Sequence, residues 1–124
     1  MVLIDTSVWS AHLREGQADL IGLLNDSYVI CHPFIIGELA CGSLKNRKEI
    51  LSLLQSLPVT TVAEHEEVMQ FIDDHKLMNR GLGYIDVHLL ASAMLSGVSI
   101  LTFDKKLDQV CSELGMDLVN EERR

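Results

Sequence analysis

Short apolar segments alternate with longer amphipathic segments along the whole chain, and this alternation limits the possible folds more than any other feature. The short segments are too short for helices and are typical of buried strands; they cover residues 2–4, 28–31, 59–62 and 98–102, with a possible fifth at 117–119. The segments between them carry apolar residues at helical spacing and cover residues 8–14, 18–24, 33–42, 48–57, 64–78, 84–95 and 105–114. We therefore expect an α/β fold of three layers, with a central parallel sheet of four to five strands and helices on both faces.

The length of 124 residues is that of one domain. Hydrophobic residues make up 48% of the chain, which is enough to form a core. No stretch rich in proline, glycine or serine interrupts the alternating pattern to form a linker. We expect residues 1–124 to form a single domain.

The formal net charge of −8 argues against a protein that coats nucleic acid non-specifically, since such proteins present a basic surface. A nuclease remains possible, because a bound metal ion can supply positive charge where it is needed. No apolar run is long enough to cross a bilayer, and the first residues lack the pattern of a signal peptide. The three cysteines show no C-x-x-C spacing. Buried thiols in a reducing cytoplasm are the expected reading.

Two acidic residues directly follow predicted strands. Asp5 comes after the first strand, and Asp104 comes after the strand at 98–102. Each also precedes a predicted helix, so each alone can be read as a helix N-cap. Ligands of parallel α/β sheets bind at the carboxyl ends of the strands. The position of the two acids is therefore also that of a functional site.

Asp86 is the most informative acid, because it lies near the start of a helix that is otherwise apolar on all sides. A carboxylate in such surroundings is costly unless it is paired or bound to a cation. Glu38 lies in the helix at 33–42, at the edge of its apolar face. The simpler interpretations are a first-turn acid favoured by the helix dipole for Asp86 and an exposed helical acid for Glu38.

Four carboxylates in one cleft would repel one another, and some would stay protonated without a counter-charge. Mg²⁺ or Mn²⁺ removes this problem, because hard cations prefer oxygen ligands. A metal held in this way can activate water and stabilise charge on a phosphodiester. The histidines show no zinc-type spacing, and neither a P-loop nor a dinucleotide-binding motif is present. Basic residues that could contact phosphate are Lys45, Arg47 and Arg80.

Four blocks of the sequence together resemble a known family. They read D-T-S-V-W at 5–9, G-E-L-A at 37–40, G-Y-I-D-V-H-L-L-A at 83–91 and L-T-F-D at 101–104. In order and spacing the chain resembles the PIN-domain ribonucleases of the VapC toxin type, and the resemblance spans almost its whole length. Any one block alone would be weak evidence.

The resemblance implies a PIN fold and cleavage of RNA that depends on Mg²⁺ or Mn²⁺. It also implies a homodimer and a cognate antitoxin that reaches into the cleft of a type II toxin. The acids that match the family motif, as metal ligands and catalytic residues, are Asp5, Glu38, Asp86 and Asp104. The hydroxyl residues that would support the site are Thr6, Ser7 and Thr102.

Two alternatives stay open at this point. A receiver-like domain with a phosphorylated aspartate and a Mg²⁺ site fits poorly, since only Asp5 follows the first strand and no acid directly follows the strand at 59–62. A PIN scaffold that binds RNA or protein without cleaving it would not need all four acids. The metal-dependent endoribonuclease is therefore the preferred hypothesis.

Overall fold

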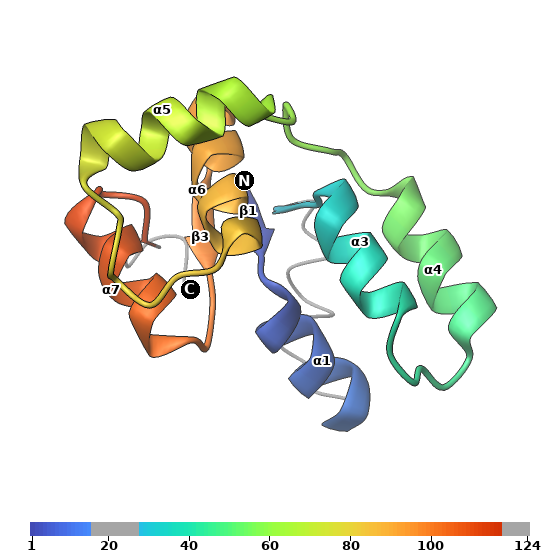
Figure 1. Cartoon of the computed structure of the whole chain (residues 1–124). Coiled ribbons are helices and arrows are strands. Elements are labelled where there is room, and N and C mark those ends of the chain that lie inside the picture. The colour runs from blue at the N-terminus through green and yellow to red at the C-terminus, as the bar shows by residue number, and fades with distance from the viewer. Residues whose placement is uncertain (16–27, 118–124) are drawn as a thin grey trace.

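The computed structural model describes residues 1–15 and 28–117 (Figure 1). The strands are β1 (Val2–Ile4), β2 (Val29–Ile30) and β3 (Ser99–Leu101). The helices are α1 (Thr6–Glu15), α3 (Pro33–Ala40), α4 (Arg47–Ser56), α5 (His65–His75), α6 (Tyr84–Ser96) and α7 (Lys105–Glu113). Helices separate the three strands as predicted, but α3, α4, α5 and α6 follow β2 without a strand between them. The helix expected at 18–24 lies outside the described residues.

The three strands form one parallel sheet in the order β2-β1-β3. Val2 of the central strand pairs with Val29 on one side and with Ser99 on the other. The chain runs from β1 to β2 on one side and then crosses to β3 on the opposite side. This reversal of direction beside β1 is the position at which open α/β sheets bind their ligands.

The strand predicted at 59–62 is the main difference from expectation, because it is reduced to a bridge between Val59 and Cys31. After this bridge the backbone leaves the sheet. The N–H groups of Thr61 and Ala63 donate to the hydroxyls of Ser96 and Ser92 on α6, at 2.9 and 3.0 Å. Thr60 N–H still donates to the Cys31 carbonyl at 2.9 Å, and beyond it the segment runs along α6, whose serine hydroxyls accept from its backbone. In the possible fifth strand, Asp117 is a bend and residues 118–119 lie outside the described residues.

Two groups of helices flank the strands (Figure 1). In this view α1, α3 and α4 lie on one side, and α5, α6 and α7 lie on the other. Helix α6 is buried along most of its length, as its apolar sequence predicts. It ends at Gly97, whose φ of 66° is the left-handed conformation that glycine adopts easily. Since α6 leads directly into β3, its N-terminus lies at the carboxyl edge of the sheet.

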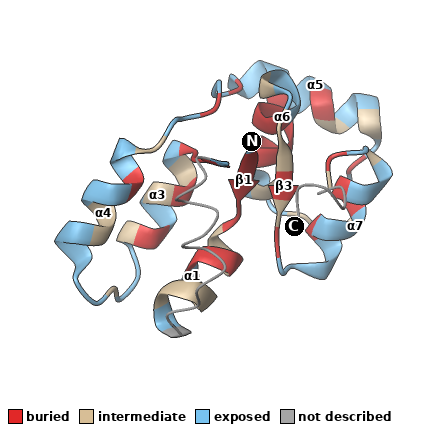
Figure 2. Cartoon of the chain, turned by 180° about the vertical axis from the view of Figure 1, so that it is seen from behind, coloured by how far each residue is buried: buried red, intermediate tan, exposed pale blue. Residues whose placement is uncertain are grey.

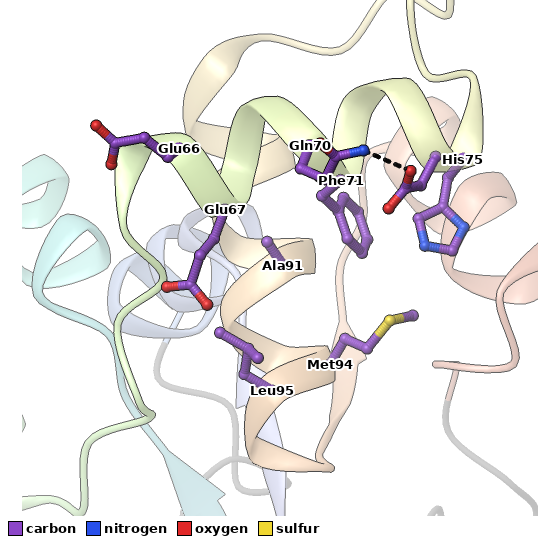
Figure 3. Close-up of a pocket in the computed structure, with 9 residues that line it drawn as sticks. Glu66, Glu67, Gln70, Phe71, His75, Ala91, Met94 and Leu95 are labelled. Atoms are coloured by element: carbon purple, nitrogen blue, oxygen red, sulfur yellow. Dashed lines mark hydrogen bonds between the residues drawn. The ribbon is translucent and has the colours of Figure 1, made fainter.

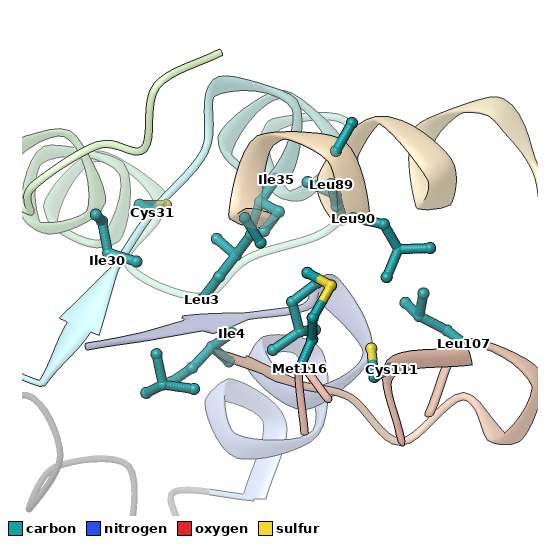
Figure 4. Close-up of a cluster of buried hydrophobic side chains, with 14 of the residues drawn as sticks. Leu3, Ile4, Ile30, Cys31, Ile35, Leu89, Leu90, Leu107, Cys111 and Met116 are labelled. Atoms are coloured by element: carbon teal, nitrogen blue, oxygen red, sulfur yellow. The ribbon is translucent and has the colours of Figure 1, made fainter. Parts of the chain in front are cut away.

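The core forms where the helices meet the sheet, and buried residues concentrate along β1, α6 and the facing sides of the other helices (Figure 2). Leu3 and Ile4 of β1 contribute to it from the centre (Figure 4). Ile35 of α3 and Leu89 and Leu90 of α6 are all fully buried. This packing places α3 and α6, which carry two of the predicted site acids, against the central strand. None of the described helices is long and apolar enough to cross a membrane.

Candidate active site at the carboxyl edge of the sheet

Asp5 lies at the end of the central strand and is 7% exposed. Its Oδ2 accepts hydrogen bonds from the hydroxyl of Thr102 at 2.8 Å and from that of Ser7 at 2.9 Å. The two hydroxyl oxygens are 3.3 Å apart. A buried carboxylate is tolerated when donors of this kind replace the lost water. Ser7 and Thr102, two of the three hydroxyl residues predicted to support the site, therefore contact Asp5.

Glu38 comes to the same edge on α3. The hydroxyl of Thr6, next in sequence to Asp5, donates to Glu38 Oε1 at 2.9 Å. The Glu38 side chain is exposed and stays in contact with solvent. This hydrogen bond joins residues 32 positions apart and places Glu38 beside the end of β1.

Asp86 lies in the first turn of α6, where its Oδ2 accepts a hydrogen bond from the backbone N–H of Gly83 at 3.1 Å. Burial raises the pKa of this carboxyl above its ordinary value, and the negative charges of Asp5 and Asp104 raise it further. Asp86 therefore lies in the first turn of its helix, as the simpler interpretation predicted. Asp5 and Asp104 both lie within electrostatic reach of Asp86.

Asp104 is the N-cap of α7. Its Oδ1 accepts from the backbone N–H groups of Lys106 and Leu107 at 2.9 and 3.0 Å. Its own N–H donates to the Thr102 hydroxyl at 3.0 Å. The capping role and the place beside Asp5 are compatible, because the cap uses one carboxylate oxygen and leaves Oδ2 available.

The donor set of this edge fits a hard divalent cation better than any other ligand. It consists of carboxylate and hydroxyl oxygens, without a thiol or an imidazole among the residues just described. Within residues 1–15 and 28–117, no three side chains of the ligating types meet at metal-binding distances. Each acid instead faces its own hydrogen-bond donors, which is the arrangement expected of like charges without a cation between them. A bound cation would stabilise the ionised carboxylate of Asp86 and would therefore lower its raised pKa.

The basic residues predicted to contact substrate differ in their surroundings. Arg80 forms a two-pronged salt bridge with Glu113, at 3.0 and 2.7 Å. Arg47 donates to the carbonyl of Ala40 at 2.9 Å, and Lys45 is exposed. A substrate role for Arg80 stays a prediction and would require the ion pair with Glu113 to open or to be shared.

A buried polar network joins His32, Ser92 and His88, and it could not be predicted from the sequence because its members are far apart along the chain. His32 Nδ1 accepts from the N–H of Phe34 at 3.0 Å, so the neutral ring carries its hydrogen on Nε2. That nitrogen lies 3.1 Å from the Ser92 hydroxyl. Ser92 also accepts from Ala63 N–H, which leaves its own hydrogen for His88 Nδ1 at 3.4 Å. The network joins the end of β2, helix α6 and the segment that follows the bridge.

Burial, together with a smaller effect of the nearby His88, lowers the pKa of His32 to about 4. The pKa of His88 is also lowered, mainly by burial. Both rings are therefore neutral parts of the core at neutral pH. They are structural histidines and not metal ligands.

A groove of about 470 Å³ lies between α5 and α6 (Figure 3). Phe71, Met94 and Leu95 line it, with Glu66 and Glu67 at its edge. Met94 and Leu95 belong to the last turns of α6, whereas Asp86 lies in the first turn. The groove is thus apolar and separate from the four acids, so it is not the catalytic cleft.

The chain is a parallel α/β domain with acidic side chains near the carboxyl end of its central strand. The family model of the PIN domain matches residues 2–113. The chain therefore belongs to the PIN-domain family, as its four sequence blocks predicted.

Two curated relatives are each named Ribonuclease VapC32, from the H37Rv and CDC 1551 strains of Mycobacterium tuberculosis. Each is 44% identical over 122 residues, which cover 98% of this chain and 98% of the relative. At this identity and coverage the chain is of the VapC type within the PIN-domain family.

The crystal structure of PAE2754 from Pyrobaculum aerophilum has the same fold, with a TM-score of 0.59 at 17% identity. The match covers 92% of this chain and 94% of that one. The predicted fold class is confirmed. The relation to a VapC-type PIN domain also removes the receiver-like alternative.

Proposed function

We propose that this chain is an endoribonuclease that depends on a divalent cation, and that it is the toxin of a toxin–antitoxin pair. One observation carries the proposal: hydrogen bonds through Thr102 hold Asp5 and Asp104 together at the sheet edge, within electrostatic reach of the partly buried carboxyl of Asp86. The identity of 44% to relatives named Ribonuclease VapC32 supports the choice of RNA as the substrate. Mg²⁺ or Mn²⁺ is the expected cation, because all four candidate ligands are carboxylates.

In this proposal the cation is held by Asp5, Asp86, Asp104 and Glu38. When bound, it would supply positive charge against the phosphodiester and lower the pKa of a coordinated water molecule. The chain itself contributes orientation. Two hydroxyls fix the carboxylate of Asp5, so its free Oδ1 keeps one direction without rearrangement during the reaction.

The hydrogen bonds of the other acids serve the same purpose. Asp86 and Asp104 accept backbone N–H groups, and each of these bonds uses a single carboxylate oxygen. Glu38 is exposed and held only by Thr6, so it is the acid with most freedom to turn toward substrate or cation. The expected reaction is in-line attack of water on RNA, leaving a 5′-phosphate and a 3′-hydroxyl.

The same proposal includes a cognate antitoxin, a homodimer and a cytoplasmic location. The net charge of −8 and the acidic sheet edge favour an antitoxin segment that carries arginine or lysine. Co-expression with the product of the neighbouring gene tests the antitoxin, and it is expected to inhibit cleavage at equimolar amounts. The mass in solution, measured by light scattering, tests the homodimer.

The nuclease is tested by incubating cellular RNA with the purified protein and Mn²⁺ or Mg²⁺. Cleavage is expected with the metal, and it is expected to stop in EDTA and in the variants Asp5→Asn and Asp86→Asn. Asp108→Asn is the matched control, because Asp108 is an exposed acid in the first turn of α7, outside the proposed ligand set. Full cleavage in EDTA, or by Asp86→Asn, would contradict the proposal.

Thermal unfolding gives a second readout that does not depend on a suitable RNA. A cation that binds only the folded protein raises the melting temperature by mass action. Millimolar Mn²⁺ is expected to raise it for the wild type and for Asp108→Asn, and not for Asp86→Asn. RNA binding without cleavage, in a protein that responds to Mn²⁺, would instead support the non-catalytic scaffold.

A further inference from the structure

Phe103 is an exposed aromatic ring placed between two residues of the site. It follows Thr102 and precedes Asp104, and it is 58% exposed. No other large hydrophobic side chain in the described part of the chain is as exposed. Aromatic residues make up only 5% of the sequence, so this one occupies an unusual position. An isolated exposed ring is common on protein surfaces, and the case for a function depends on what holds it there.

The backbone of Phe103 is fixed to the acids. Its N–H donates to the Ser7 hydroxyl at 3.0 Å, and this hydroxyl donates to Asp5 Oδ2 at 2.9 Å. The flanking Thr102 donates to the same oxygen at 2.8 Å. Two short chains of hydrogen bonds therefore set the position of the Phe103 backbone relative to Asp5. The ring projects from a backbone as ordered as that of the site itself.

A second ring lies beside the first. The centroids of His12 and Phe103 are 6.2 Å apart, and the ring planes are tilted by 37°. His12 belongs to α1 and follows Asp5 by seven residues, which is about 10 Å along a helix axis. Both rings thus come from segments that leave the sheet edge next to Asp5. They form one aromatic surface close to the proposed cleavage site.

The negative net charge of the protein makes uncharged, aromatic contacts with RNA advantageous. Binding of RNA commonly depends on lysine and arginine contacts to phosphate, but this chain has a net charge of −8. Two of the predicted phosphate contacts, Arg80 and Arg47, are engaged with Glu113 and with the carbonyl of Ala40. Stacking of a base on an aromatic ring is a contribution to affinity that does not require positive charge.

We infer that Phe103, with His12 beside it, stacks a base of single-stranded RNA next to the phosphodiester that is cleaved. This inference rests on the proposed ribonuclease function and names the substrate class as unpaired RNA, since a base within a duplex does not offer its face. The surroundings favour a base over a protein side chain. The neighbours Asp104, Lys105 and Lys106 are exposed and charged, so the ring is not part of an apolar patch.

The test measures the affinity of metal-free protein, in EDTA, for a short fluorescein-labelled single-stranded RNA of mixed sequence. Phe103→Leu keeps an apolar side chain and removes the π-face. It is expected to weaken binding roughly 5- to 100-fold, the range found for loss of one stacked base. Phe103→Trp is expected to restore the affinity.

Tyr28→Leu is the matched control. Tyr28 is another exposed aromatic residue, 51% exposed, and its carbonyl accepts from the N–H of Val2 at the opposite end of β1 from Asp5. This variant is expected to bind as the wild type does. Because both residues are exposed, all variants are expected to keep the wild-type melting temperature.

The salt dependence of RNA affinity distinguishes base stacking from phosphate contacts. A lost phosphate contact reduces the slope of log Kd against log salt by about 0.7 for a single strand. Phe103→Leu is expected to lower affinity by the same factor at low and high salt. In addition, RNA that contains 2-aminopurine is expected to lose fluorescence on binding the wild type and to lose less on binding Phe103→Leu.

Unchanged RNA affinity in Phe103→Leu would overturn the inference, as would an effect that disappears at high salt. So would a variant that loses only binding to a protein partner, since the ring would then be a protein contact. Wild-type cleavage with Mn²⁺ is measured in parallel. Normal stacking without cleavage contradicts the proposed nuclease alone, whereas cleavage that is insensitive to Phe103→Leu, with unchanged affinity, contradicts the stacking role alone.

Discussion

The hydroxyl of Thr102 donates a hydrogen bond of 2.8 Å to Oδ2 of Asp5, and this contact joins residues 97 positions apart. It connects the carboxyl ends of β1 and β3, the two strands between which the site lies. The same oxygen of Thr102 accepts from the N–H of Asp104 at 3.0 Å. A single buried hydroxyl therefore positions two of the four acids.

Replacement of Thr102 by valine tests this role, because valine keeps the shape and removes the hydroxyl. A hydrogen bond to a charged acceptor is worth about 1.5–3 kcal/mol, so we expect the free energy of unfolding to fall by about 2 kcal/mol. We also expect cleavage of RNA to slow at least tenfold, because Asp5 loses one of its two side-chain donors. Urea unfolding and initial cleavage rates measure the two effects. Thr102→Ser restores the hydroxyl, and if it were as impaired as the valine variant, the hydroxyl would not be the cause.

The raised pKa of Asp86 predicts a conflict between stability and metal binding. A group with a raised pKa in the folded state stabilises the fold below its unfolded pKa, and this stabilisation is lost as the pH rises through the folded value. At neutral pH the ionised carboxyl is therefore unfavourable without a cation. We expect Asp86→Asn to raise the stability of the metal-free protein at neutral pH, because it removes a charge that burial and the neighbouring acids disfavour. Thermal unfolding in EDTA measures it, and a clearly less stable variant would show that Asp86 stabilises the fold as an ordinary capping acid.

The lowered pKa of His32 predicts loss of stability in acid. Between the ordinary histidine value of 6.5 and the folded value of about 4, the unfolded chain binds a proton that the folded protein does not bind. Stability is therefore complete above pH 6.5 and falls as the pH is lowered to about 4, by up to about 3 kcal/mol. Urea unfolding across this range measures the slope.

His32→Asn removes the titrating ring and keeps an oxygen that can accept from Phe34 N–H. We expect the free energy of unfolding of this variant to depend less on pH between 4 and 6.5 than that of the wild type. His65→Asn, at an exposed position on α5, controls for the change of residue type. The interpretation fails if the slopes of wild type and His32→Asn are the same.

Ser92 and Ser96 lie one turn apart on α6, and they differ in how deeply their hydroxyls are buried. Ser92 is fully buried and serves Ala63 N–H, His32 and His88, whereas Ser96 serves Thr61 N–H near the surface. We expect Ser92→Ala to cost about 2–4 kcal/mol, because it leaves buried donors without partners, and Ser96→Ala to cost about 0.5–1 kcal/mol. Urea unfolding of both variants measures the difference. Equal costs would mean that the buried network does not brace the core.

The sequence contains clearer signals for candidate site residues than for the details of the sheet. Asp5 and Asp104 could be located because they directly follow apolar strands, and Asp86 because it interrupts an apolar helix. Residues 59–62 match a strand pattern because they are β-branched, but only one bridge forms, since the N–H groups of Thr61 and Ala63 bond to serines on α6. Local propensity cannot reveal a partner that lies some 30 residues further along the chain.

The exposure of Phe103 is a second feature that the local sequence could not predict. It lies inside the L-T-F-D block, yet its residue type at the end of a strand suggests a core position. Only the folded chain leaves it exposed, because Ser7 holds its backbone at the sheet edge. The salt bridge between Arg80 and Glu113 could not be predicted either, because the residues are 33 positions apart and the sequence around each does not indicate the other.

The sequence alone predicted strands separated by helices, the parallel sheet and four candidate acids, because these follow from periodicity, from residues next to one another and from the resemblance of four blocks to one family. Tertiary structure decided which donors hold each acid, that His32 and His88 are buried and neutral, and that Phe103 stands beside Asp5 in solvent. These features depend on contacts between distant segments. Such contacts are fixed only when the helices pack against the sheet and bring the carboxyl ends of β1 and β3 together.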